Sequence, residues 1–323
     1  MRYRPASIAS LLVSLALVSG ATACGTDTPV TAETAAASAT TTTSSAANAA
    51  AVDALVAQFP ATPPKTVVAA SVPLAEVLTL LEIPVAGVPS TTTQQLPAAL
   101  NDVPRIGSTM APDVEKIIKL SPDLVIAAET SRSTIEASLA STTTPAAFLE
   151  TDSFGDLKLA VEVLGEAFDK QAEADKILAS MTANESALAT AGAATDAPKV
   201  LVLIGATDSF MVMNNNSFMG SLIELSGADN IAVSALGVKE TYSAVNLENI
   251  IAAAPDVVLV LRSGNVAEGQ AAFDAEVAKN AAWKSLPAYA DDRIHVLDYA
   301  TFGYTSVGQL DKAVPTLTGL LYP

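Results

Sequence analysis

The chain is poor in the residues on which most enzyme active sites and metal centres depend. Its 323 residues include one cysteine and one histidine. A single cysteine cannot form a disulfide within the chain. The sequence also has no glycine-rich phosphate loop, no Gly-x-Ser-x-Gly elbow and no His-Glu-x-x-His motif. These absences predict a protein that is not an enzyme and has no intrinsic cofactor.

Positive charge is scarce as well. Lysine and arginine number 17 against 34 aspartate and glutamate residues, which gives a net charge of −17 at pH 7. Two of the basic residues and no acidic residue precede Cys24, so the rest of the chain has 15 basic and 34 acidic residues and a net charge of −19. This negative net charge argues against nucleic acid and anionic lipid as partners. An anionic ligand would need local cations.

Residues 1–23 have the pattern of an export signal. Two arginines precede an apolar run at 8–18, and small residues then lead to Cys24. The run is short for a transmembrane helix, and no other stretch is long enough. The end of the segment resembles the lipobox of bacterial lipoproteins, with Ala21 where leucine is commonest. We therefore expect a lipidated Cys24, with an ordinary cleaved signal as the alternative.

Residues 24–60 are mostly alanine, threonine and serine. Such a segment cannot bury enough apolar surface to order itself, so we expect a disordered tether between the membrane and the first domain. Within it, residues 53–59 could form one marginal helical turn with Asp53 as its cap.

One pattern occurs twice in the remaining chain. Residues 112–127 and 245–260 share a glutamate, any residue, Ile-Ile, three residues, Pro-Asp and an apolar run. Each copy predicts a short helix with both isoleucines inward, a stop at Pro-Asp and a strand covered on both faces. A helix followed by Pro-Asp and a strand could also recur by chance in an α/β protein. Two copies in matching register favour two lobes built on the same plan.

Each copy lies within a longer alternation of strands and helices. In the N-terminal lobe, residues 61–150, we expect strands at 67–70, 83–88, 124–127 and 147–149 and helices at 73–81 and 131–140. In the C-terminal lobe, residues 193–323, we expect strands at 199–204, 211–213, 257–260 and 293–297 and helices at 217–226, 269–279 and 309–320. Between the lobes, residues 151–192 have apolar positions at helical spacing, which predicts one long linking helix with a break near Gly165 as the alternative.

Taken in order, these segments resemble a known family. The lipobox, "PLAEVL", "IGSTMAPDVEKIIKLSPDLVI", "ENIIAAAPDVVLV" and "AAWKSLPAYADDRIHVLD" resemble the substrate-binding lipoproteins of iron-chelate and vitamin-B12 ABC importers, over residues 62–320. The resemblance implies two Rossmann-like lobes joined by a single long helix, with a ligand cleft between them. It also implies delivery of the solute to an ABC permease dimer with its ATPase, at the extracytoplasmic face of the bacterial cell membrane.

The resemblance gives the repeated glutamates a role. In the family, one glutamate on each lobe docks onto arginines of the permease, and by motif position these are Glu115 and Glu248. Carboxylates on both lobes suit a two-fold partner through charge-assisted pairing. The alternative is that each is a first-turn acid favoured by the helix dipole. The two roles are compatible.

Within the family, "IGSTMAP" with "FGYT" is most similar to the haem receptors of Gram-positive iron-surface systems. There a methionine is an axial haem ligand, and Met110 occupies its place. The opposite ligand in those receptors is a histidine, but this chain has Ser263, which follows Arg262. Tyr304 and Tyr242 are the substitutes we consider. For Met110 and both tyrosines the alternative role is lining of the cleft.

The ligand stays open between haem, a ferric hydroxamate siderophore and cobalamin. A catecholate chelate would need an arginine cluster, and of the arginines after Cys24 only Arg105, Arg132 and Arg262 are expected near the cleft. His295 alternates with Ile294 and Val296, so it is expected to pack in the sheet. A haem-relay surface module without a permease is the alternative of another class, and the paired glutamates argue against it.

Overall fold

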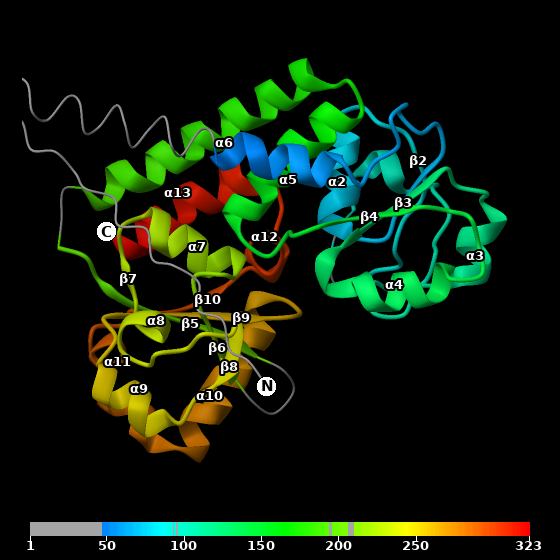
Figure 1. Cartoon of the computed structure of the whole chain (residues 1–323). Coiled ribbons are helices and arrows are strands. Elements are labelled where there is room, and N and C mark those ends of the chain that lie inside the picture. Colours follow the sequence, from blue (N-terminus) through cyan, green and yellow to red (C-terminus); the bar gives the residue numbers. More distant parts are fainter. Residues whose placement is uncertain (1–46, 93, 95, 194–195, 206–209) are drawn as a thin grey trace, which may run out of the picture. The chain divides into compact units, whose positions relative to one another are not determined.

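The computed structural model describes residues 47–92, 94, 96–193, 196–205 and 210–323. Residues 48–323 form one unit, which is drawn in colour in Figure 1. The predicted signal peptide, Cys24 and residues 24–46 of the predicted tether lie outside the described residues.

The N-terminal lobe is built on a parallel sheet. In the described part of the chain its strand order is β2-β1-β3-β4, and all neighbours are parallel. The strands are β1 (Val67–Ala69), β2 (Val85–Gly87), β3 (Leu124–Ala128) and β4 (Ala146–Leu149). The helices are α2 (Val72–Leu80), α3 (Val114–Lys119) and α4 (Arg132–Leu139), with 3-10 turns at Ala98–Leu100 and Glu129–Ser131. These elements confirm the predicted ones, with ends shifted by one or two residues.

The C-terminal lobe has a mixed sheet in the order β10-β9-β5-β6-β8, with β7 also paired to β5, counting described strands only. The strands are β5 (Lys199–Gly205), β6 (Phe210–Met213), β7 (Asp229–Asn230), β8 (Tyr242–Ala244), β9 (Val257–Arg262) and β10 (Ile294–Leu297). The helices are α7 (Phe218–Leu225), α8 (Ile231–Ser234), α9 (Leu247–Ala253), α10 (Val266–Lys279), α11 (Pro287–Ala290), α12 (Tyr299–Phe302) and α13 (Leu310–Leu321), with a 3-10 turn at Ala281–Ser285. Strand β6 runs antiparallel to both of its described neighbours, β5 and β8, whereas the other described pairs of this sheet are parallel.

The two sheets share one topology. Strands β7, β5, β9 and β10 pair side by side and parallel, as β2, β1, β3 and β4 do. The predicted duplication is therefore confirmed at the level of strand order. Strands β6 and β8, which pair with each other antiparallel, are an addition to the C-terminal copy.

The repeated Pro-Asp has a structural reason. The Asp123 carboxylate accepts from the Thr66 amide at the start of β1 (2.9 Å), and Asp256 accepts from the Lys199 amide at the start of β5 (2.8 Å). Both pairs are separated by 57 residues, so the two copies have the same register. Each aspartate thus ties the start of its own strand to the neighbouring strand. The prediction that both isoleucines point inward is wrong for the first copy, where Ile117 is buried but Ile118 is exposed, because adjacent helical residues point about 100° apart. In the second copy Ile250 is buried, and Ile251 is partly buried and packs against the same core.

Both sheets are covered on two faces. Alternate residues of β1 and β3 join different hydrophobic clusters, and the same holds for β5 and β9. One cluster covers the outer face of each sheet, whereas the largest cluster includes residues from both lobes. In that shared cluster lie side chains of α2, α7 and α13 together with the inner faces of both sheets. A buried Val, Leu or Ile side chain contributes roughly 1.5–3 kcal/mol relative to an exposed one, so this shared core holds the lobes together.

The linking segment is a helical hairpin and not one helix. Helix α5 (Phe154–Ala167) and helix α6 (Gln171–Gly192) are separated by a turn in which Asp169 has a φ of 55°. The helices pack side by side and antiparallel, with an ion pair between Lys158 and Glu185 at 2.8 Å (Figure 1). The break expected near Gly165 lies just beyond it. Gly165 permits the close approach, because a Cβ there would meet the Ala174 side chain at 2.5 Å.

Residues 48–60 are packed against the domain, so the predicted tether is wrong over this range. Residues 47–56 are helical, Val52 and Phe59 are buried, and the Phe59 ring packs edge-on against Phe168. The Gln58 side chain both donates to and accepts from the backbone of Phe148, which extends the edge of β4. These contacts offset the conformational entropy that is lost when the segment becomes ordered, which its alanine-rich sequence alone would not offset.

Candidate functional site

Met110 lies at the tip of a tight loop that precedes α3. A β-bridge between Gly107 and Pro112 closes the loop, and the Ala111 amide donates to the Ser108 hydroxyl oxygen at 3.1 Å. The Met110 side chain is 85% exposed. A fixed loop therefore presents a soft, neutral thioether to solvent.

Gly107 makes this loop possible. Its φ is +95°, in a region that side chains other than glycine rarely adopt. A Cβ there would also lie 2.8 Å from the Ala111 carbonyl oxygen and 2.8 Å from the Asp113 amide nitrogen, both of which are backbone atoms. Neither atom can move without opening the loop.

Replacing Gly107 with alanine should destabilise the protein by about 3 kcal/mol, because backbone strain and a backbone clash add together. Gly237→Ala is the matched control, since Gly237 also has a positive φ but a Cβ added there would meet no atom within 4 Å. We expect that control to cost about 1 kcal/mol. Denaturant unfolding of both variants measures the difference. Equal costs would show that the tight approach of the loop backbone is not required.

Three tyrosines come together in the C-terminal lobe. Tyr304 is half-buried and follows α12, and its ring packs edge-on against Tyr299, the first residue of that helix, with centroids 4.9 Å apart. Tyr242 on β8 is 44% exposed and lies close enough to Tyr299 and Asp152 to feel both electrostatically. The structure thus packs Tyr304 against Tyr299, a residue that sequence reasoning missed, and places Tyr242 within electrostatic range of Tyr299.

The surroundings of Tyr242 oppose its ionisation. Burial, then the negative charge of Asp152, then Tyr299 raise the pKa of Tyr242 above its ordinary value. Asp152 itself has a raised pKa, through burial and then repulsion from Asp156. The pKa of Glu150 is likewise raised, first by burial and then by the neighbouring carboxylates. Tyr242 is therefore a poor source of a phenolate.

Glu76 joins α2 to the segment that follows Tyr304. Its carboxylate accepts from the Ser306 hydroxyl at 2.8 Å, the Val307 amide at 3.1 Å and the Gly308 amide at 3.2 Å. These bonds connect the two lobes across more than 230 residues of sequence. Glu76 consequently fixes the chain two residues from Tyr304.

Arg262 and Ser263 end β9. Arg262 is half-buried and pairs in register with Gly205 of β5, and Ser263 is exposed. Gly264 follows with a φ of +107°, so the chain turns sharply here. A serine hydroxyl at this position is exposed at the carboxyl end of a strand, where ligands of α/β folds bind.

The other candidates have structural partners. Arg132 forms a bidentate ion pair with Glu129 and lies over the ring of Phe148. Arg293 donates to the carbonyl oxygens that end α13, at Leu320 and Leu321. His295 lies in β10 as predicted, opposite Leu259 of β9. Its pKa is lowered by burial and then by Arg293, which favours the neutral imidazole.

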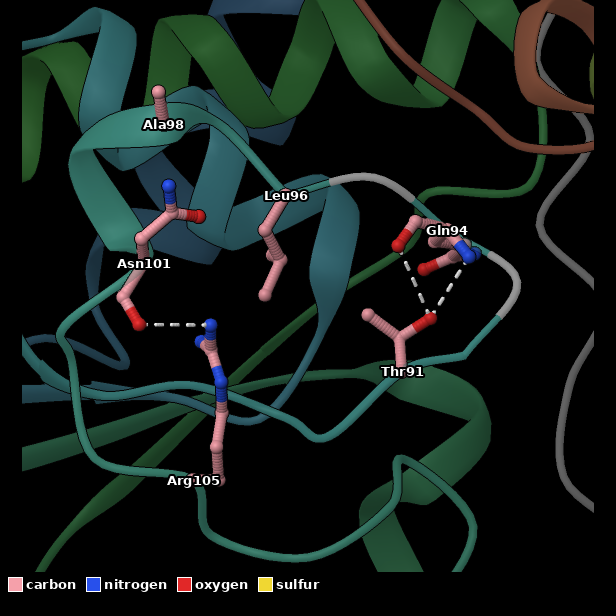
Figure 2. A pocket seen from close by; sticks show the side chains of 6 residues that line it. All are labelled: Thr91, Gln94, Leu96, Ala98, Asn101 and Arg105. Carbon is pink, nitrogen blue, oxygen red and sulfur yellow. Dashed lines mark hydrogen bonds between the residues drawn. The ribbon is translucent and has the colours of Figure 1, made fainter.

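Arg105 lines a cavity of the N-terminal lobe with a volume of about 260 Å³, shown in Figure 2. The described lining residues all belong to residues 91–105. Arg105 therefore does not belong to the tyrosine group.

Glu115 and Glu248 occupy equivalent places in the two lobes. Each is exposed and lies in the first turn of its helix, α3 or α9. Asp113 and Asn246 cap these helices by accepting from backbone amides. Among the described residues neither glutamate forms an ion pair. Both carboxylates are therefore available to a partner.

Comparison with known proteins decides the family. A family model described as "Periplasmic binding protein" matches residues 67–301. The chain belongs to this family. The haem uptake protein IsdE of Staphylococcus aureus is 29% identical over 258 residues, which cover 79% of this chain and 87% of that protein.

Solved structures agree with this assignment. An ABC transporter substrate-binding protein from Listeria monocytogenes is 30% identical, with a TM-score of 0.72 over 80% of this chain and 98% of that one. S. aureus IsdE complexed with haem is 28% identical, with a TM-score of 0.70 over 80% and 99% of the two chains. This periplasmic binding protein is thus a two-lobed α/β protein homologous to haem-binding components of ABC importers.

The relatives are substrate-binding proteins of transport systems that act outside the cytoplasm with ABC permeases. Among residues that the structure describes, no helix is long and apolar enough to cross a membrane. In the same residues, no three His, Cys, Asp or Glu side chains gather as a metal site.

Sequence reasoning missed Glu76 and Tyr299 in this periplasmic binding protein. Nothing in the local pattern marks Glu76, because its partners lie more than 230 residues away. Tyr299 had a weak signal, since it follows directly after the strand-ending Leu297-Asp298 pair. Residues that follow a strand in an α/β fold are placed at the edge where ligands bind.

Proposed function

We propose that this protein is an extracytoplasmic, lipid-anchored receptor that captures haem and delivers it to an ABC permease. The observation that carries the proposal is Met110, an exposed thioether on a loop fixed by Gly107, at the motif position where similar haem receptors have an axial methionine. Homology to S. aureus IsdE, which has been crystallised in complex with haem, supports it.

In this proposal the ligand binds in a cleft between the lobes, with Met110 on one side of the iron and Tyr304 on the other. Thioether sulfur and tyrosinate are both known haem ligands. Tyr304 is preferred to Tyr242, because its ring is held against Tyr299 and Glu76 fixes the chain two residues beyond it. Tyr242, Arg262 and Ser263 then line the site.

Hemin titration of the purified protein tests the proposal. The parent should show a shifted Soret band, and Met110→Ala and Tyr304→Phe should each weaken binding by about tenfold or more, equivalent to about 1.4 kcal/mol per factor of ten. Tyr289→Phe is the control, because this exposed tyrosine of α11 lines a different cavity.

No spectral change in the parent would refute the haem assignment. If both single variants keep their affinity for hemin, neither Met110 nor Tyr304 is a ligand of the iron. In the second case Ser263 becomes the residue to examine, since it stands where a histidine is expected.

A ferric hydroxamate or cobalamin is the second candidate. Ser263 favours it, because a serine is a poor axial ligand but a good hydrogen-bond partner for a neutral chelate. Tight hydroxamate binding without a hemin signal would establish this candidate.

Anchoring and docking complete the proposal. Lipidated Cys24 holds the protein at the membrane, and residues 24–46 connect this anchor to the folded domain. Glu115 and Glu248 each contact one half of the permease dimer, which works with its ATPase. A free carboxylate on each lobe gives a two-fold partner two equivalent points of attachment.

A further inference from the structure

We propose that the cavity beside Arg105 is a binding site for an alkyl carboxylate. The cavity, of about 260 Å³, is lined by Thr91, Gln94, Leu96, Ala98, Asn101 and Arg105. Figure 2 shows Arg105 reaching beside Leu96 toward the Asn101 carbonyl, with Thr91 and Gln94 on the opposite side.

The Arg105 guanidinium is incompletely satisfied. Its Nη2 donates to the Asn101 carbonyl oxygen at a long 3.3 Å. Its Nη1 is buried, and in the described part of the chain it has no hydrogen-bond partner. Burying a donor without an acceptor costs about 1–3 kcal/mol, and more when the group is charged. An acceptor in the cavity would offset that cost.

The charge of Arg105 is also unbalanced. No acidic residue is among the described residues that line the cavity, and Arg105 forms no ion pair with any described carboxylate. In a chain of net charge −17, a half-buried arginine without a carboxylate stands out. The missing counter-charge fits an anion from outside the chain.

The lining selects a carboxylate over a phosphate. One guanidinium with one unpaired nitrogen, Nη1, matches a single planar group of charge −1, whereas a phosphate needs further cations or a row of backbone amides. Leu96 and Ala98 supply an apolar wall for an alkyl stem. Gln94 adds a neutral amide side chain, so the polar side carries no competing negative charge.

The carboxylate has two possible sources. One is a propionate arm of haem, which rests on the proposed function. One hydrogen bond supports this source. The Ser90 amide donates to the Gly107 carbonyl oxygen at 2.6 Å. This bond joins the residue just before the cavity lining to the loop that presents Met110. The other source is a free small carboxylate, which does not depend on haem.

Sodium propionate is the probe, added to the full chain with sodium chloride of equal ionic strength as the reference. The parent should gain at least about 2 °C in melting temperature, because a ligand that binds only the folded state stabilises it. Arg105→Met and Gln94→Leu should lose this gain. Lys119→Met, which removes an exposed cation of α3, should keep it. Absence of a gain in the parent would overturn the site.

Haem and its dimethyl ester then distinguish the sources. If the arm of haem occupies the cavity, Arg105→Met should lower haem affinity about tenfold and leave ester affinity unchanged. If Arg105→Met loses the stabilisation by propionate but keeps its haem affinity, the cavity binds a free carboxylate. A propionate effect in a parent that binds no haem would refute the proposed function and leave the site standing.

Discussion

Replacing both Glu115 and Glu248 with alanine should lower transport by more than about 100-fold while ligand affinity stays unchanged. Truncating one partner of a buried, charge-assisted pair costs about 2–5 kcal/mol, and two such pairs would be lost at once. Because both side chains are exposed and form no ion pair with described residues, the folded protein itself should keep its stability. The measurement is haem uptake by cells that carry the importer, beside hemin titration of the purified variants.

The matched control is the double variant Glu166→Ala, Glu224→Ala. These glutamates are also exposed, lie on α5 and α7 and change the net charge by the same amount. Each single variant at Glu115 or Glu248 should give an intermediate loss. Transport that survives the double change would show that the two carboxylates serve only their helix ends.

Replacing Glu76 with alanine should lower the free energy of unfolding by about 2–3 kcal/mol, because three donors of the segment 306–308 lose their acceptor. Haem binding should weaken as well, since the same segment positions Tyr304. Glu76→Gln should cost much less, because Oε1 alone accepts from both Ser306 and Gly308. Glu82→Gln is the control, since this nearby side chain is 75% exposed.

The comparison of parent and Glu76→Gln also has a defined pH dependence. Burial raises the pKa of Glu76 above its ordinary value of 4.5, against the opposing effect of its three hydrogen bonds. The folded state therefore binds a proton that the unfolded state releases, and stability falls as the pH rises through the folded pKa. The parent should gain stability relative to Glu76→Gln as the pH is lowered from 7 toward 4.5. A difference that does not change with pH would show that burial leaves this carboxylate unperturbed.

Much of the fold could be predicted because its signals are local. A run such as Val257 to Val260 is covered on both faces of the sheet, so all of its residues are apolar. Its ends are therefore visible in the sequence. The Pro-Asp step was visible twice because it performs the same task twice, at Asp123 and Asp256. The role of Met110 stays a prediction from its motif; the structure shows only that the residue is exposed.

The errors arise where distant contacts override local pattern. The apolar positions of residues 151–192 continue at helical spacing through the turn at Asp169, so periodicity alone cannot show that the helix folds back. Val52, Leu55, Val56 and Phe59 have the i, i+3, i+4, i+7 spacing of a packed helix, but the surrounding alanines and threonines hide it. The pairing of Tyr299 with Tyr304 and the reach of Glu76 follow only from the assembled chain.

The hydrophobic cluster common to both lobes restricts how far they can swing apart. A wide hinge motion would bring its apolar side chains into water, at roughly 25 cal/mol for each Å² uncovered. The antiparallel pair of α5 and α6 braces the same region. We therefore expect the two lobes to keep nearly the same separation when a ligand binds, so that any change is local.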